Sequence, residues 1–173
     1  MGVTYTTATA NTYVPIATYT LPSNQTSYTF SSIPSTYTDL VLVVSNLTTT
    51  VAGFSIYMEF NADSAANYSE TWLNGDGTTA TSARRTADTK GFLGGYGSGT
   101  STTNPALAVG HIMNYANATT YKTALVRYSQ TSAETNTLVN LWRSTAAINA
   151  IRIFTGGTMV AGTVMSLYGI LGA

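Results

Sequence analysis

The sequence predicts an all-β fold, a sandwich of about nine or ten antiparallel strands. Threonine makes up about a fifth of the chain, and with 12 Tyr residues and frequent Val and Ile it favours pleated strands. Short segments alternate apolar and polar residues with a period of two, and turn residues separate them. Helical periodicity is hard to find. Together these observations favour two packed sheets.

A chain of 173 residues is expected to form one domain. Residues 1–12 are Thr-rich without an apolar face and predict a flexible N-terminal arm, which leaves 13–173 as a single β-sandwich domain. The expected strands are 13–21, 27–33, 40–44, 54–60, 68–73, 106–114, 120–129, 137–142, 148–154 and 164–170.

Two of these segments carry further expectations. The clearest alternation places Phe54, Ile56, Met58 and Phe60 inward. The segment 40–44 is apolar without alternation, which predicts a strand covered on both faces, one by the core and the other by a different element such as another subunit.

Residues 74–104 are the most loop-like stretch of the chain. They begin with the turn signal Asn74-Gly75-Asp76-Gly77 and include the glycine-rich run Gly94–Gly99. The run lacks the Gly-Lys-Ser/Thr ending of a phosphate-binding loop, and no helix is predicted after it. A long loop in a compact domain is usually functional or mobile.

Charged residues are only 8% of the chain, and seven basic and seven acidic residues cancel to a net charge of +0. An average soluble domain carries roughly 25%. Little charge repulsion keeps such copies apart, which predicts association with other copies. The only adjacent basic pair is Arg84-Arg85, so nucleic acid is not an expected partner. No apolar run is long enough for a membrane-spanning helix, so no membrane partner is expected either.

The side chains that carry chemistry are few, and no enzymatic activity is expected. Cys is absent, which removes disulfides, thiolate metal sites and cysteine nucleophiles. The single histidine, His111, shares a face with Leu107, Val109 and Met113 and is interpreted as a core or interface residue. No Gly-x-Ser-x-Gly elbow accompanies it. The acidic residues are Asp39, Glu59, Asp63, Glu70, Asp76, Asp88 and Glu134.

Three weaker site hypotheses remain beside this interpretation. Glu59, Asp63 and Glu70 are close enough in sequence to converge as glycosidase acids, but nothing marks a cleft between them. Asp63 with Asn61, or Asp76 with Asn74, could supply oxygen ligands to Ca²⁺, although turn hydrogen bonding is the simpler role. Trp72 and Trp142 could stack on sugar rings, although core packing is favoured. We therefore assign no catalytic, cofactor-binding or metal-binding residue. Four sequons, at Asn24, Asn46, Asn67 and Asn117, are expected by chance in a Thr-rich chain.

Several phrases occur together in a fixed order along the chain. They are Phe30-Ser31-Ser32-Ile33-Pro34, Thr36-Tyr37-Thr38-Asp39-Leu40, Phe60-Asn61-Ala62-Asp63, Asn67-Tyr68-Ser69, Leu141-Trp142-Arg143-Ser144-Thr145-Ala146-Ala147-Ile148-Asn149 and Ser166-Leu167-Tyr168-Gly169-Ile170. This order resembles a family of virion structural proteins of tailed bacteriophages, of the cyanophage type, from about residue 13 to the C-terminus. Residues 76–104 take no part in the resemblance.

The resemblance implies an antiparallel jelly-roll-like β-sandwich on a phage particle, commonly a homotrimer, assembled in the bacterial host cytoplasm. It transfers no catalytic residue; Asp39 and Arg143 are expected to pair or to cap sheet edges. The expected role is a capsid decoration, or cement, protein that bridges subunits of the major capsid protein. The alternative is a tail-fibre or receptor-binding module that recognises host-surface glycans with loops such as 74–104.

Overall fold

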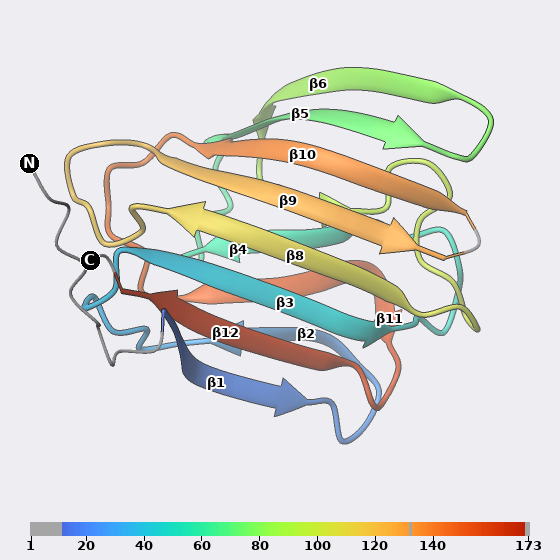
Figure 1. The fold of residues 1–173 in the computed structure, drawn as a ribbon, viewed down its shortest axis with the longest axis horizontal. Helices are drawn as coiled ribbons and strands as arrows, with labels where there is room; N and C mark the ends of the chain where they lie inside the picture. Colours follow the sequence, from blue (N-terminus) through green and yellow to red (C-terminus); the bar gives the residue numbers. More distant parts are fainter. Residues whose placement is uncertain (1–11, 132, 172–173) are drawn as a thin grey trace, which may run out of the picture.

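The computed structural model describes residues 12–131 and 133–171, and this part of the chain is all β (Figure 1). Its twelve strands form two antiparallel sheets, which confirms the predicted β-sandwich. The strands are β1 (Tyr13–Thr20), β2 (Gln25–Phe30), β3 (Asp39–Leu47), β4 (Ile56–Phe60), β5 (Tyr68–Gly75), β6 (Ala80–Asp88), β7 (Gly91–Gly94), β8 (Ala106–Met113), β9 (Lys122–Gln130), β10 (Glu134–Trp142), β11 (Ile151–Met159) and β12 (Val164–Ile170).

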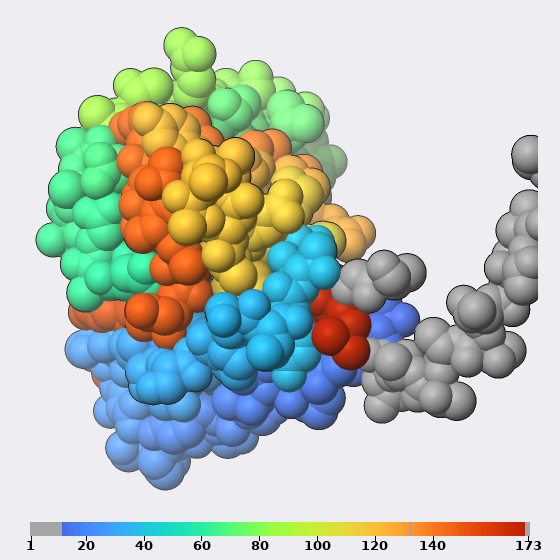
Figure 2. Space-filling model, turned by 90° about the vertical axis from the view of Figure 1, so that its left-hand side faces the viewer, coloured from blue at the N-terminus to red at the C-terminus, as the bar shows by residue number. Residues whose placement is uncertain are grey.

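The strand order is that of a jelly roll with two added hairpins. The large sheet runs β1-β12-β3-β8-β9-β10-β5-β6, and the small sheet runs β2-β11-β4-β7. Without the hairpins β5–β6 and β9–β10, each sheet keeps four strands, and the chain passes between them in the jelly-roll sequence. Both hairpins extend the same edge of the large sheet. Figure 2, which views one end of the molecule, shows the green surface of β5 and β6 and the blue surface of β1 and β2 at opposite ends.

The core lies between the two sheets and is built by the alternation predicted from the sequence. Ile56, Met58 and Phe60 of β4 are fully buried, as expected, and face Leu40, Leu42 and Val44 of β3 across the sandwich core. Phe54 lies just before β4 and is half-buried. Its ring lies so close to Gly156 and Gly157 that a Cβ at either position would be within 2.7 Å of it. These two glycines of β11 therefore make room for the ring.

The prediction of nine or ten strands was too low, and the interpretation of 74–104 as a loop was wrong over two segments. Strands β6 and β7 both lie inside that range. Residues Ala80–Ala87 of β6 are all exposed, so no apolar face marked the strand in the sequence. Strand β7 has four residues, two of them glycine, and is too short to show alternation. Strand β10 also begins earlier than expected, at Glu134, because its inward residues there are polar.

The expectation that β3 is covered on both faces is met only in part. Val41 is 7% exposed on the outer side of the sheet, whereas Val43 is half-buried. The predicted arm at 1–12 lies outside the described residues except for Thr12. Among the described residues no helix is long and apolar enough to cross a membrane.

Candidate functional site

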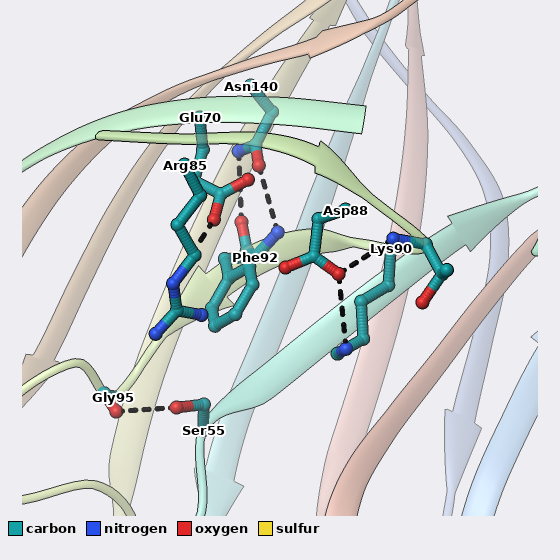
Figure 3. Close-up of polar contacts among 9 residues, drawn as sticks. Ser55, Glu70, Arg85, Asp88, Lys90, Phe92, Gly95 and Asn140 are labelled. Atoms are coloured by element: carbon teal, nitrogen blue, oxygen red, sulfur yellow. Dashed lines mark hydrogen bonds and ion pairs between the residues drawn. The ribbon is translucent and has the colours of Figure 1, made fainter. Parts of the chain in front are cut away.

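Buried polar side chains of β10 hold β7 and the glycine-rich run in place. The Asn140 amide accepts a hydrogen bond from the Phe92 N–H (2.8 Å) and donates one to the Phe92 carbonyl (2.9 Å), as Figure 3 shows. Asn136 accepts from the Gly95 N–H at 2.8 Å. Because β7 pairs only with β4, these side chains satisfy backbone groups that a neighbouring strand would otherwise satisfy.

Glu134 performs the same task for the glycine-rich run. Its carboxylate accepts hydrogen bonds from the Gly97 N–H at 2.7 Å and the Gly99 N–H at 2.9 Å. The backbone of the run therefore does bind a carboxylate, and that carboxylate is a side chain of the same chain. Gly94 has a φ of +139°, and a Cβ there would lie 2.2 Å from the Tyr128 ring. Only glycine fits at this position.

A cluster of three aromatic rings and one arginine lies where β5 and β6 extend past the small sheet. The Tyr96 ring stacks on Trp72 at 4.0 Å and on Phe92 at 4.6 Å. The Arg85 guanidinium lies 4.7 Å from the centre of the Phe92 ring and 5.4 Å from those of Trp72 and Tyr96. These contacts are cation–π interactions, and they leave the Trp72 ring engaged within the protein.

Glu70 lies beneath this cluster and is the most perturbed carboxyl group in the described part of the chain. It is 1% exposed, and neither of its carboxylate oxygens has a hydrogen-bond partner. The Arg85 Nε is 3.9 Å from Glu70 Oε1 (Figure 3). Burial, with the nearby Asp88 charge, raises the pKa of Glu70 to about 7, although the charges of Arg85 and Lys90 act to lower it.

Asp88 and Lys90 form an ion pair beside Glu70. The Lys90 Nζ is 3.3 Å from Asp88 Oδ1 and 5.0 Å from the centre of the Tyr57 ring. Burial also raises the pKa of the Tyr96 hydroxyl, with the Glu70 charge as the next cause. The hydroxyl itself is buried and has no hydrogen-bond partner. A perturbed carboxyl group alone does not make an active site, because the chemistry also needs a nucleophile or an acid–base partner positioned against it.

The structure does not bring Glu59, Asp63 and Glu70 together as a set of acids. Glu59 lies 3.8 Å from Arg152 on β11, and Glu70 faces Arg85. Asp63 accepts hydrogen bonds from Trp142 Nε1 at 2.7 Å, Asn67 Nδ2 at 2.9 Å and the Ala65 N–H at 3.0 Å. Burial alone would raise the pKa of Asp63, but these hydrogen bonds lower it. Each acid thus has a partner of its own.

The proposed calcium ligands take the roles of turn residues. Asp76 Oδ1 accepts hydrogen bonds from the Thr79 and Thr78 N–H groups, which lower its pKa. Within 12–131 and 133–171 no group of three His, Cys, Asp or Glu residues could hold a metal ion. The four sequon asparagines all make hydrogen bonds through their amides; Asn67 and Asn117 bond to nearby residues, and Asn24 and Asn46 bond to the backbone of Ala161 and Gly162.

Trp142 is 2% exposed and packs against Phe60 and Tyr68 in the core. Asp39 and Arg143 do not pair with each other. Asp39 accepts from the Asn114 N–H at 2.7 Å, whereas Arg143 donates to the Ala66 carbonyl at 2.8 Å and to Ser69. Each of the two side chains thus forms hydrogen bonds between a strand end and a neighbouring segment.

His111 lies on the outer side of the large sheet, where its Nε2 is 3.1 Å from Asp39 Oδ2. It shares this side with Leu107, Val109 and Met113, as the alternation predicted, but the side faces away from the core. Its neighbours across the ladder are Val41 and Leu125. Because both of these neighbours are apolar, neither supplies the hydroxyl of a Ser-His-Asp triad.

No described element lies over the outer side of the large sheet (Figure 1). Several apolar side chains are exposed on this side. Leu73 is 62% exposed, and Leu107, Leu125 and Val139 are 44–45% exposed. A shallow hollow of ≈ 300 Å³ between β8, β9 and β10 is lined by apolar side chains together with His111, Arg127 and Thr137. We call this surface the outer apolar face, and its residues are Leu73, Leu107, Val109, Leu125, Val139 and Leu141.

The sequence predicts strands that contain the residues of the outer apolar face, but it does not show that these residues form an exposed surface. An alternating strand shows which residues share a face, and it does not show which of two faces meets the core when both are apolar. In β10 both faces mix apolar and polar residues. The available signal was His111, which the alternation correctly placed on one face of its strand with apolar residues.

No family of known proteins has a model that matches this chain, and no curated protein matches it. Distant similarity to solved structures includes the following two. An exo-inulinase from Aspergillus awamori is 14% identical with a TM-score of 0.38, and the match covers 91% of this chain and 29% of the inulinase. A mutant of the alginate lyase Aly36B in complex with alginate trisaccharide is 8% identical with a TM-score of 0.25, covering 87% and 73% of the two chains.

Proposed function

We propose that this chain is a structural protein of a tailed-phage virion, a capsid decoration protein that assembles as a homotrimer and bridges subunits of the major capsid protein. The observation that carries the proposal is the outer apolar face. Large apolar surfaces left uncovered on a single chain mark contacts with other molecules. Here the surface spans several strands of the large sheet, in a chain with only 8% charged residues.

Three further features agree with this role. The jelly roll is a fold of viral capsid domains, although it also serves lectins and other proteins. The ordered sequence phrases resemble virion structural proteins. The polar side chains that could have formed an active site are instead paired, buried or used in turns.

The alternative is a tail-fibre or receptor-binding module for host-surface glycans. Its two candidate stacking platforms are occupied, because Tyr96 stacks on the Trp72 ring and Trp142 is buried. A glycan would have to use other residues of 74–104. The structure offers no specific observation in favour of this role.

The copy number in purified virions tests the proposal. We expect hundreds of copies per particle by quantitative mass spectrometry. We also expect particles that lack the protein to release their DNA at a lower temperature or after a milder osmotic shock. A few copies per particle, together with adhesion of the purified protein to host cells, would support the receptor-binding role instead.

A further inference from the structure

Two oppositely charged residues on the outer side of the large sheet, Arg127 and Asp39, lie at matching positions on either side of His111. His111 lies opposite Leu125 on β9 and opposite Val41 on β3. Arg127 follows Leu125 by two residues, and Asp39 precedes Val41 by two residues. Because β3 and β9 are both antiparallel to β8, they run in the same direction. Arg127 and Asp39 are therefore displaced from His111 by equal steps in opposite directions.

This arrangement makes the surface complementary to itself. We propose that the outer apolar face packs against the same face of a second copy of this chain, around a two-fold axis that passes over His111 and brings Arg127 of each copy to Asp39 of the other. The inference rests on the proposed structural function, and it identifies a second copy of this chain as one of the partners in that function. A two-fold contact of this kind joins two copies, so within trimers it would link one trimer to another.

The apolar residues support this packing because they surround the charges. Leu125 and Val139 are neighbours in the row that contains His111, and Val109 is the neighbour of Arg127. Burial of these side chains supplies the favourable free energy of association, since Leu125 and Val139 are 44–45% exposed in the single chain. The charges then fix the relative orientation, because like charges would meet in other registers.

The size of the surface also fits a pair of copies. Five strands, from β3 to β5, are about 4.8 Å apart and up to nine residues long, which gives a surface of roughly 700 Å². A stable interface buries about 800 Å² on each partner. Nucleic acid is a poor occupant, because among the described residues phosphate groups would find only Arg84 and Arg127 on this side of the sheet and would also meet the Asp39 carboxylate at the start of β3.

The test measures the mass of the full-length purified chain by analytical ultracentrifugation over a range of concentrations. We expect the wild-type protein to contain an even number of copies. Leu125→Asp should halve this mass, because it places a carboxylate in the apolar contact. Val51→Asp is the matched control, since Val51 is 59% exposed but lies in the turn between β3 and β4, and it should leave the mass unchanged.

The charge pairs give a second, independent test. Arg127→Asp should weaken the pairing about tenfold or more by leaving two carboxylates opposed at each contact. The double variant Arg127→Asp with Asp39→Arg should restore the affinity, because it exchanges the charges. Thermal unfolding of each variant checks that loss of the Asp39 hydrogen bonds has not unfolded the domain, and a variant that unfolds is replaced by Arg127→Glu alone.

The results separate this inference from the proposed function. A monomeric wild-type protein, or a mass that Leu125→Asp leaves unchanged, would overturn the two-fold contact without affecting the copy number in virions. A failure of the charge exchange to restore pairing would overturn the arrangement around His111. A low copy number with an intact two-fold pair would overturn the decoration role alone.

Discussion

The two sides of strand β10 differ from each other in the reverse of the usual sense for a sandwich, in which polar residues face outward and apolar residues face inward. Its inward residues include Glu134, Asn136 and Asn140, all at most 6% exposed, whereas Val139 on the outward side is 44% exposed. The neighbouring β5 repeats the contrast, with Glu70 buried and Leu73 exposed. Polar groups are thus buried and apolar groups face outward where the hairpins extend the jelly roll.

The contrast has a physical reason on each side. The inward polar groups bind the backbone of β7 and of the glycine-rich run, which have no strand neighbour there. Each buried hydrogen bond of this kind fixes the position of a segment that has few apolar contacts. The outward apolar groups have no such partner within one chain, which is the reason for expecting a partner outside it. The following predictions test one side against the other.

Asn140→Ala should have the largest effect, lowering the free energy of unfolding by about 3–4 kcal/mol. It leaves both the N–H and the carbonyl of Phe92 buried without a partner, at about 1–3 kcal/mol each. Val139→Ala, at the next residue and on the outward side, should cost less than about 1 kcal/mol. Urea unfolding of both variants measures the difference; equal losses would mean that the inward hydrogen bonds do not hold β7.

Glu70→Gln should change the pH dependence of stability by about 3 kcal/mol. The pKa of Glu70 is raised from 4.5 to about 7 in the folded state, so its neutral form is favoured there. The stability that this group contributes is complete below pH 4.5 and is lost as the pH rises through 7. The Gln variant has no such loss and should gain relative to wild type between pH 5 and pH 8. A constant difference across this range would show that Glu70 does not titrate as its burial implies.

Arg85→Met should cost about 1 kcal/mol, because it removes the cation–π contacts while keeping an apolar stem over the rings. The half-exposed position of Arg85 limits the effect. The loss should be larger at pH 8 than at pH 5, where Glu70 is neutral and needs no counter-charge. Denaturation at both pH values measures this, and a loss independent of pH would separate Arg85 from Glu70.

Leu125→Thr should have the smallest effect on stability, within about 0.5 kcal/mol, because the side chain is 45% exposed and threonine suits a strand. It should nevertheless weaken association between copies, as measured by sedimentation. A marked loss of stability without a change in association would assign Leu125 to the fold rather than to a contact.

The sequence predicted most of the sandwich because its central strands bury one apolar face. Strands such as β4 and β12 alternate clearly, and the burial of Ile56, Met58 and Leu167 follows that pattern. Strand β6 could not be predicted, since all of Ala80–Ala87 is exposed and only pairing with β5 makes it a strand. Long-range pairing of this kind leaves no periodic signal in one sequence.

The candidate site was harder to predict than the fold. Glu70 was noted as one of three acids, but its perturbation comes from burial beneath Arg85 and Tyr96, which are distant in the chain. The binding of the glycine-rich run by Glu134 depends on the hairpin β9–β10 reaching residues 97–99. The outer apolar face could not be predicted, because the sequence does not show which side of the large sheet the small sheet covers.

The claim that the outer apolar face is a contact surface can be tested directly because the chain contains no Cys. A Leu125→Cys variant has one thiol, and its labelling rate by a maleimide reports whether the outer apolar face is covered. We expect rapid labelling in dilute protein and at least tenfold slower labelling in assembled protein or virions, with Val51→Cys labelled at one rate in both. Equal rates for Leu125→Cys in dilute and assembled protein would contradict the claim that this face is a contact surface.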